Sequence, residues 1–349
     1  MLTITSPSFS GISTPKKSTV SNDPKKPETL PTSPTTKGSR QPVYLHQWGM
    51  GLWPFKLIGK PKPVELVHVN IGLHNLPKEL VDLKIAHLSD LHAHHDYGRL
   101  PKNYWENAID KVVEAKPDVI VFTGDAVHLG SHFLTKATKL LSQLPKNTPK
   151  IAVLGNHDMA DGQHGKGASQ ALKDAGFIVL EDSVTDIMLR GKRIRLLGAK
   201  DCCGEKGSLS NVLAKQSIQA LREVLNKVRY HQTPADLKIG LVHHPDLAKK
   251  LKKNNLNAQL FLAGHTHGGH HQFKKEPLKG LYKWAKERFA FGTPKYNHKL
   301  YTIYGNRKLY VSGGMATHMQ IKWEHPLATM PPIRFGMPPE IPILTLKQA

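Results

Sequence analysis

Short apolar runs, most of which end in a cluster of polar residues, constrain the fold of this chain more than any other feature. Six such runs occupy residues 83–88, 119–123, 151–154, 194–198, 239–242 and 259–263. Several are apolar throughout instead of alternating, which is typical of strands covered on both faces. Amphipathic stretches lie between them, and Ser217–Val228 carries its apolar residues on one helical stripe. The pattern predicts an α/β layered domain.

The polar clusters predict a metal site. Five of the runs end in Ser89-Asp90-Leu91-His92, Gly124-Asp125, Gly155-Asn156-His157-Asp158, His243-His244-Pro245-Asp246 and Gly264-His265-Thr266-His267. Open α/β sheets bind ligands beyond the carboxyl ends of their strands, where loops converge on a rigid platform. Asp, His and Asn donors suit Mn, Fe or Zn, and the lack of cysteine among them argues against a purely structural zinc site. We expect Asp90 and His92 to lie on an extended segment and to point to the same side, with His265 and His267 sharing that spacing.

The charge and composition of the chain indicate the chemical class of its binding partner and the limits of its domain. The 349 residues carry a formal charge of +22, which favours an anionic partner: a phosphate-rich metabolite, nucleic acid or anionic lipid. Residues 1–42, rich in Ser, Thr, Pro and Lys, are expected to form a disordered tail, followed by an aromatic and apolar lead-in at 43–63 and a catalytic domain over 64–349. Because the sequence lacks both a secretory signal and an apolar segment of ~20 residues, we expect a cytoplasmic protein. Cys202 and Cys203 are too few for a disulfide framework.

The order of the motifs DxH, GD, GNHD, a later His and GHxH, between about Leu83 and Gly268, resembles that of the calcineurin-like metallophosphoesterase family. The resemblance implies a four-layer α-β-β-α sandwich with two divalent metal ions at the carboxyl ends of the strands. It implies Mn²⁺ foremost, with Fe, Zn, Mg or Co as alternatives. The implied ligands are Asp90, His92 and His267 for the first ion, Asn156, His243 and His265 for the second, and Asp125 as the bridge between them.

The same resemblance implies the catalytic residues. His157 corresponds to an acid–base histidine that protonates the leaving oxygen, and Asp158 is expected to hold its imidazole in place. The expected reaction is in-line attack of an activated water on phosphorus without a covalent phospho-enzyme. Arg99 and His95 are candidate phosphate ligands, although solvated loop residues remain an alternative. His244 is expected to be a second-shell or substrate-facing residue.

The substrate prediction comes from the C-terminal part of the chain. Residues 309–314 and 333–341 resemble the branch that contains membrane-associated bacterial phosphodiesterases and the chlamydial-type UDP-2,3-diacylglucosamine pyrophosphatase. A basic and aromatic insertion is predicted at 270–308, and residues 270–310 contain ten Lys or Arg against two Glu, a mixture that suits a bilayer surface. An alternative is that this segment and the lead-in pack on the core.

Our hypothesis is that the protein cleaves UDP-2,3-diacylglucosamine to UMP and 2,3-diacylglucosamine 1-phosphate, in lipid A synthesis. It places the protein in the cytoplasm, peripheral to the inner membrane, in contact with an anionic membrane surface and without an obligate protein partner. The first alternative is a general phosphodiesterase or nuclease, because a basic surface also suits polyanions. The second alternative is a non-catalytic protein that binds membrane or nucleic acid.

Overall fold

The computed structural model describes residues 62–93, 100–128, 133–161, 164–203, 210–227, 233–253, 256–269, 296, 298–316 and 338–349. The predicted tail at 1–42, nearly all of the lead-in at 43–63 and most of the insertion at 270–308 lie outside these residues. No helix in these ranges is both long enough and apolar enough to cross a bilayer.

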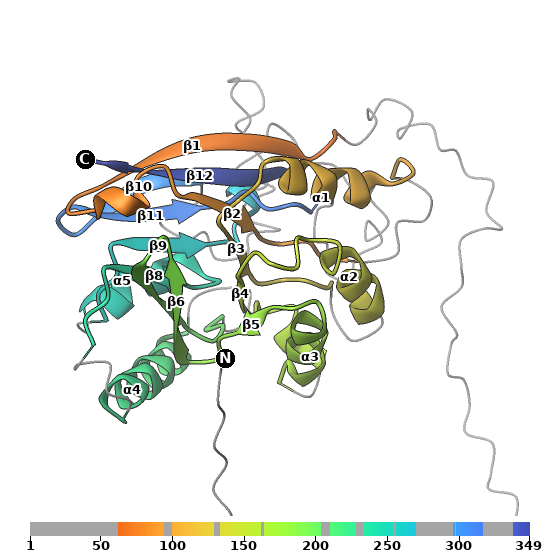
Figure 1. The fold of residues 1–349 in the computed structure, drawn as a ribbon. Coiled ribbons are helices and arrows are strands. Elements are labelled where there is room, and N and C mark those ends of the chain that lie inside the picture. The colour runs from red at the N-terminus through yellow and green to blue at the C-terminus, as the bar shows by residue number, and fades with distance from the viewer. Residues whose placement is uncertain are drawn as a thin grey trace, which may run out of the picture. The chain divides into compact units, whose positions relative to one another are not determined.

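Two six-stranded sheets form the centre of the fold (Figure 1). The first sheet has the order β1 (Glu65–Leu73), β12 (Glu340–Gln348), β2 (Lys84–Leu88), β3 (Val119–Thr123), β4 (Lys150–Val153) and β5 (Ile178–Val179). The second has the order β10 (Lys299–Ile303), β11 (Arg307–Val311), β9 (Leu260–Ala263), β8 (Leu237–Leu241), β7 (Lys192–Gly198) and β6 (Ser183–Leu189). Strands β2 to β5 run parallel to one another, as do β11, β9, β8 and β7. Their carboxyl ends therefore lie along one edge of each sheet.

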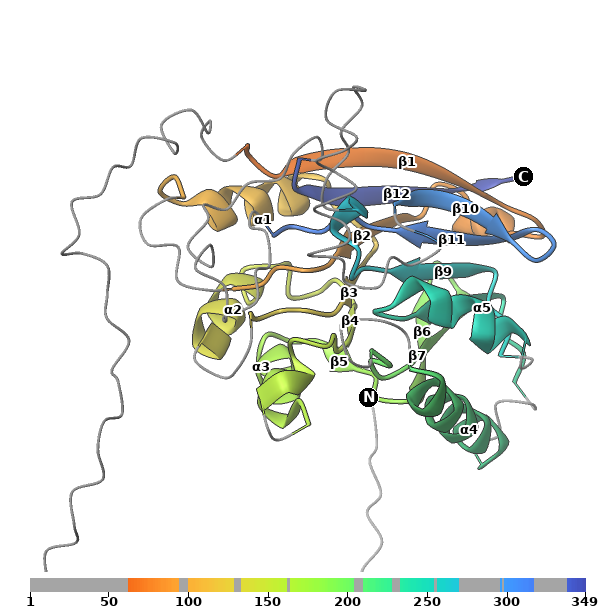
Figure 2. The same cartoon turned by 180° about the vertical axis from the view of Figure 1, so that it is seen from behind.

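Helices cover the outer face of each sheet (Figures 1 and 2). The first sheet is covered by α1 (Tyr104–Glu114), α2 (Leu134–Leu141) and α3 (Lys166–Asp174), and the second by α4 (Asn211–Lys227) and α5 (Pro245–Lys253). Short 3-10 turns occur at Lys78–Leu80, Met159–Asp161 and His267–Gly269. The layers are helix, sheet, sheet and helix, which confirms the predicted fold class.

Burial on both faces explains why the strands have no polar alternation. In β3, Val119 and Val121 pack between the two sheets, whereas Ile120 and Phe122 pack against the outer helices. The strand is buried at all five positions. Since successive side chains point to opposite faces, a strand with apolar layers on both sides must be apolar throughout.

The structure moves two predicted boundaries. Helix α4 begins at Asn211, six residues before the predicted start at Ser217, because Val212 and Leu213 are exposed and lie off the buried stripe that marked the helix. Residues 299–308, which the prediction assigned to the insertion, belong to the hairpin of β10 and β11 at the edge of the second sheet.

Candidate metal centre

The candidate metal ligands follow directly after five parallel strands. Asp90 and His92 follow β2, Asp125 follows β3, Asn156 follows β4, His243 follows β8, and His265 and His267 follow β9. All seven are in the described part of the chain, and Asp90, His92, Asp125, His243 and His267 are each no more than 2% exposed. The edges of the two sheets therefore bring together side chains that are up to 177 positions apart in sequence.

Four donors form the first cluster. His92 Nε2 lies 3.2 Å from His267 Nε2 and 3.2 Å from Asp125 Oδ2. Asp90 Oδ1 lies 3.6 Å from His267 Nε2 and 3.9 Å from His92 Nε2. Two donors at about 2.0–2.1 Å from one tetrahedral ion are about 3.3 Å apart. These separations are therefore those expected of donors that share a cation.

The second cluster shares Asp125 with the first. Asp125 Oδ2 lies 3.3 Å from His243 Nε2. Asn156 Oδ1 is 3.1 Å from both His243 Nε2 and His265 Nδ1, and these two nitrogens are 3.3 Å apart. One carboxylate oxygen thus belongs to both donor sets, which is the arrangement that a bridged two-metal site requires. The residues present fit two divalent cations.

Left-handed backbone aims these ligands. Asp90, His92, Asp125, His265 and His267 all have positive φ, between 45° and 71°. The prediction of an extended segment carrying Asp90 and His92 is wrong, because each of them makes a left-handed turn instead. Such conformations are uncommon for residues with a Cβ and cluster at functional sites.

Hydrogen bonds between neighbouring loops hold this conformation. The N–H groups of Asp90 and His92 donate to the carbonyls of Gly124 and Asp125, each at 2.9 Å. The N–H of His265 donates to both carboxylate oxygens of Asp90 at 3.1 Å. The loop after β2 is therefore hydrogen-bonded to the loop after β3 and to the loop after β9.

A buried chain of hydroxyl groups connects Asp90 to the interior of the first sheet. Ser89 Oγ donates to Asp90 Oδ2 at 2.5 Å, and Thr123 Oγ1 donates to Ser89 Oγ at 2.8 Å. Because the threonine hydroxyl has one hydrogen, the 2.9 Å contact between Thr123 Oγ1 and His87 Nε2 must be donated by the histidine. The chain fixes the orientation of the Asp90 carboxylate.

The glycine motifs leave room for these carboxylates. A Cβ on Gly264 would collide with Ser89 Oγ and would lie 2.5 Å from Asp90 Oδ2. A Cβ on Gly155 would collide with Asp125 Oδ1. The backbone therefore approaches the ligands more closely than any residue with a side chain would allow.

Without cations, imidazoles balance the charge of Asp125. Burial acts to raise the pKa of Asp125, but His243 and the other nearby imidazoles outweigh it and hold that pKa well below its usual range. For His243, burial acts to lower the pKa, and the Asp125 carboxylate outweighs it and raises the pKa well above its usual value. The Asp125 carboxylate is thus a buried negative charge that needs positive neighbours.

The structure corrects the expected role of Asp158. Its carboxylate accepts the N–H groups of Asp125, Ala126 and Gly155 at 2.8–2.9 Å, and that of Val127 at 3.3 Å. Among the described residues, His157 Nδ1 has no hydrogen-bond partner. Asp158 therefore ties the loop after β4 to the loop after β3, and it does not orient the imidazole. A carboxylate has about four lone-pair sites, and four backbone N–H groups already occupy those of Asp158.

His157 lies beside the first cluster. The centroid of its ring is 4.6 Å from that of His92. The backbone N–H of His157 donates to Asp125 Oδ1 at 2.9 Å. The sequence analysis did not identify His128, whose ring stacks on that of His157 at 5.1 Å with an interplanar angle of 22°. His128 is the third residue after Asp125, so the rule that functional residues follow strands would have identified it.

Of the three predicted substrate contacts, the structure describes one. His95 and Arg99 lie outside the described residues. His244 is 2% exposed, its Nδ1 accepts the N–H of Asp246 at 3.2 Å, and its ring lies 4.9 Å from that of His265. Burial, followed by the nearby charges of His265 and His243, lowers the pKa of His244 to about 2. His244 is thus a neutral imidazole packed behind the second cluster.

Cys203 is a further residue that the sequence analysis did not place at the site. It follows β7, and its Sγ lies 3.9 Å from His265 Nδ1 and 3.8 Å from His265 Nε2. Cys203 Sγ, His244 and His265 form a group whose candidate ligand atoms lie within 4.8 Å of one another.

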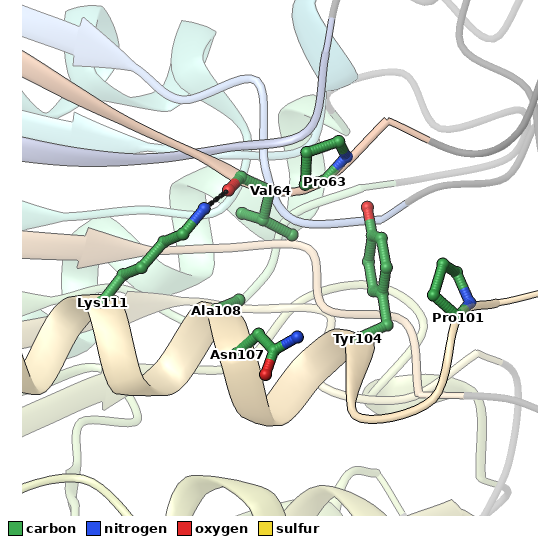
Figure 3. Close-up of a pocket in the computed structure, with 7 residues that line it drawn as sticks. All are labelled: Pro63, Val64, Pro101, Tyr104, Asn107, Ala108 and Lys111. Carbon is green, nitrogen blue, oxygen red and sulfur yellow. Dashed lines mark hydrogen bonds between the residues drawn. The ribbon is translucent and has the colours of Figure 1, made fainter.

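A separate cavity of about 120 Å³ lies between α1 and the start of β1 (Figure 3). Lys111 Nζ donates to the Val64 carbonyl at 3.0 Å across it, and Tyr104 donates to the Lys62 carbonyl. None of its seven lining residues belongs to the metal clusters. Its polar groups are used to fasten the start of β1 to α1, and we assign it a structural role.

A family model, several sequence relatives and several solved structures match this chain. The family model of the calcineurin-like phosphoesterases matches residues 83–269. An uncharacterized metallophosphoesterase of Bacillus subtilis (strain 168), YkuE, is 29% identical over 296 residues, which are 82% of this chain and 87% of the relative. A transmembrane protein with a metallophosphoesterase domain from Danio rerio is 25% identical over 69% of this chain, which spans 54% of that relative. The structure of Haemophilus influenzae NAD nucleotidase matches with a TM-score of 0.39 and 14% identity, over 66% of this chain and 49% of that one.

Proposed function

This chain belongs to the calcineurin-like phosphoesterase family, and we propose that it hydrolyses phosphoesters at a centre of two divalent cations. The observation that carries the proposal is the sharing of Asp125 Oδ2 between two compact donor clusters, at 3.2 Å from His92 Nε2 and 3.3 Å from His243 Nε2. A structural metal site has no need of a carboxylate placed between two sets of donors. When bound, a pair of cations neutralises phosphoryl charge and lowers the pKa of water.

In this proposal the side chains of the protein have three tasks: they bind the cations, donate a proton and fix the backbone of the site. Asp90, His92 and His267 would hold the first cation, Asn156, His243 and His265 would hold the second, and Asp125 would contribute to both sites. His157 lies next to the first cluster, and it donates a proton to the oxygen that leaves phosphorus. Asp158 fixes the backbone that carries Asp125 and His157 by accepting four N–H groups.

The test separates metal binding from proton donation. We expect metal-free protein to be inactive on an aryl phosphodiester and to regain activity with Mn²⁺, Mg²⁺, Co²⁺ or Zn²⁺ added singly. Asp125→Ala should abolish turnover and reduce the bound metal, whereas His157→Ala should lower kcat by about 10²–10⁴ without loss of metal. The exposed His74 offers a control substitution, His74→Ala, that should change neither. An inactive wild-type protein with a full complement of metal would refute the assignment.

The identity of the phosphoester is a finer proposal. The preference for UDP-2,3-diacylglucosamine, and for a position at the inner membrane, is supported by the basic and aromatic composition of residues 270–310. That segment is mainly outside the described residues, so UMP release from the lipid substrate with Mn²⁺ is the deciding assay. Absence of UMP release from an enzyme that still cleaves an aryl phosphodiester would remove this substrate and favour the alternative of a general phosphodiesterase.

A further inference from the structure

The loop after β7 brings a thiol to the second donor cluster. Strand β7 is parallel to β8, so the residues that directly follow the two strands lie along the same edge of the second sheet. The N–H of Cys203 donates to Asp201 Oδ2 at 3.0 Å, which fixes the turn that presents the thiol. Its Sγ lies 3.9 Å from His265 Nδ1, the nitrogen that also faces Asn156 and His243.

This separation fits two donors of one ion. With metal–sulfur and metal–nitrogen bonds of about 2.3 and 2.0–2.1 Å, two donors of one tetrahedral zinc ion are about 3.6 Å apart. The 3.9 Å between Cys203 Sγ and His265 Nδ1 is about 0.3 Å longer than that separation. Asn156 Oδ1 and His243 Nε2 lie 3.1 and 3.3 Å from His265 Nδ1, so the thiol is farther from this nitrogen than either of them.

A buried carboxylate supplies an independent indication of positive charge here. Asp201 Oδ1 is buried and has no hydrogen-bond partner among the residues that the structure describes. An unpaired carboxylate oxygen in a buried position is costly unless a cation is nearby.

We propose that Cys203 is a ligand of the second cation, in addition to Asp125, Asn156, His243 and His265. Thiolate ligands select Zn²⁺ and Fe²⁺ over the harder Mn²⁺ and Mg²⁺, so the second site prefers a thiophilic metal and the first, made of carboxylate and imidazole, does not. Binding of the cation releases the thiol proton to solvent. The inference rests on the proposed two-metal centre and deepens it by assigning a ligand and a metal preference to one half.

Cobalt substitution tests the assignment without any measurement of activity. Metal-free wild-type protein is loaded with Co²⁺, whose thiolate complexes absorb in the near ultraviolet and whose imidazole and carboxylate complexes absorb in the visible. Cys203→Ser should lose the thiolate band and keep the visible bands. Cys202→Ser is the matched control, because the neighbouring Cys202 is buried and its thiol donates to the Lys200 carbonyl at 3.2 Å. This variant should keep both.

A metal titration gives the second readout. Cys203→Ser should weaken Zn²⁺ binding at the second site by about 10–100-fold and weaken Mn²⁺ binding less. Should Cys203→Ser fail to fold, X-ray absorption of the zinc-loaded wild-type protein decides, through the presence or absence of sulfur at about 2.3 Å.

The outcomes distinguish the ligand from the centre. Visible cobalt bands without a thiolate band in the wild-type protein would overturn the role of Cys203 and leave the two-metal centre intact. No cobalt binding by the wild-type protein would overturn both the ligand assignment and the proposed function.

Discussion

His87 makes the stability of the metal-free protein fall in acid, and the structure allows the effect to be estimated. The imidazole is fully buried, donates from Nε2 to Thr123, and has no partner for Nδ1 among the described residues. Protonation would place a second N–H, at Nδ1, in a site without an acceptor. Burial lowers the pKa of His87 to about 3, against the opposing charge of Glu340.

The sign and size follow from linkage. An unfolded histidine has a pKa of about 6.5, so below that value the unfolded chain binds a proton that the folded protein refuses. Stability contributed by His87 is therefore intact above about pH 6.5 and is lost progressively as the pH falls toward about 3. At about pH 5 the loss is about 2 kcal/mol, since each pH unit below the unfolded pKa costs about 1.4 kcal/mol.

The assay is urea unfolding of chelated protein at about pH 7.5 and pH 5. The wild-type protein should lose about 2 kcal/mol more between the two pH values than His87→Gln, whose amide can still donate to Thr123 but does not titrate. His74→Gln is the control, since His74 is exposed and lies outside the core. An identical pH dependence in wild-type protein and His87→Gln would refute the reasoning.

Three further substitutions test the support of the ligands. Ser89→Ala removes the hydroxyl that orients the first carboxylate, and we expect a loss of about 10–100-fold in metal affinity at the first site, measured by titration of metal-free protein. Gly264→Ala forces a methyl group into Ser89 and should destabilise the fold by about 1–3 kcal/mol, whereas Gly72→Ala, whose Cβ would lie 3.3 Å from that of Ala349, should change stability by less in the same unfolding assay. Asp158→Asn replaces one acceptor oxygen by a donor facing backbone N–H groups and should cost about 1–3 kcal/mol in chemical unfolding, and an unchanged stability would contradict the role assigned to this carboxylate.

The sequence determined the fold and the positions of the candidate ligands because both depend on rules of strand period and strand ends. An apolar run such as Val119–Thr123 has only one place in a layered domain, between two apolar layers. The residue after such a run lies at the ligand-binding edge. These two rules sufficed to group Asp125 with residues more than a hundred positions away.

The same rules failed where tertiary hydrogen bonds make the choice. Asp158 could orient an imidazole or accept backbone N–H groups, and only the approach of the loop after β3 decides for the latter. The backbone of Cys203 is held by a hydrogen bond from its N–H to Asp201 Oδ2, which no periodic pattern encodes. The substrate prediction concerns residues 270–308, most of which are outside the described part of the chain, and it stays a prediction.

The left-handed ligands connect strain with function. Glycine would relax the backbone at Asp90, Asp125 and His265, where φ lies between 50° and 71°, because it adopts positive φ without steric cost. Glycine has no side-chain atom that could bind a metal. At these positions the chain must therefore combine a strained backbone with a side chain that reaches the cluster. Each such residue costs on the order of 1–2 kcal/mol, and the loop hydrogen bonds that fix it can offset that amount. Positive φ also occurs away from the ligands, at residues such as Asn75, Lys116 and Arg190, so it marks the metal centre only together with the donor side chain that each ligand carries.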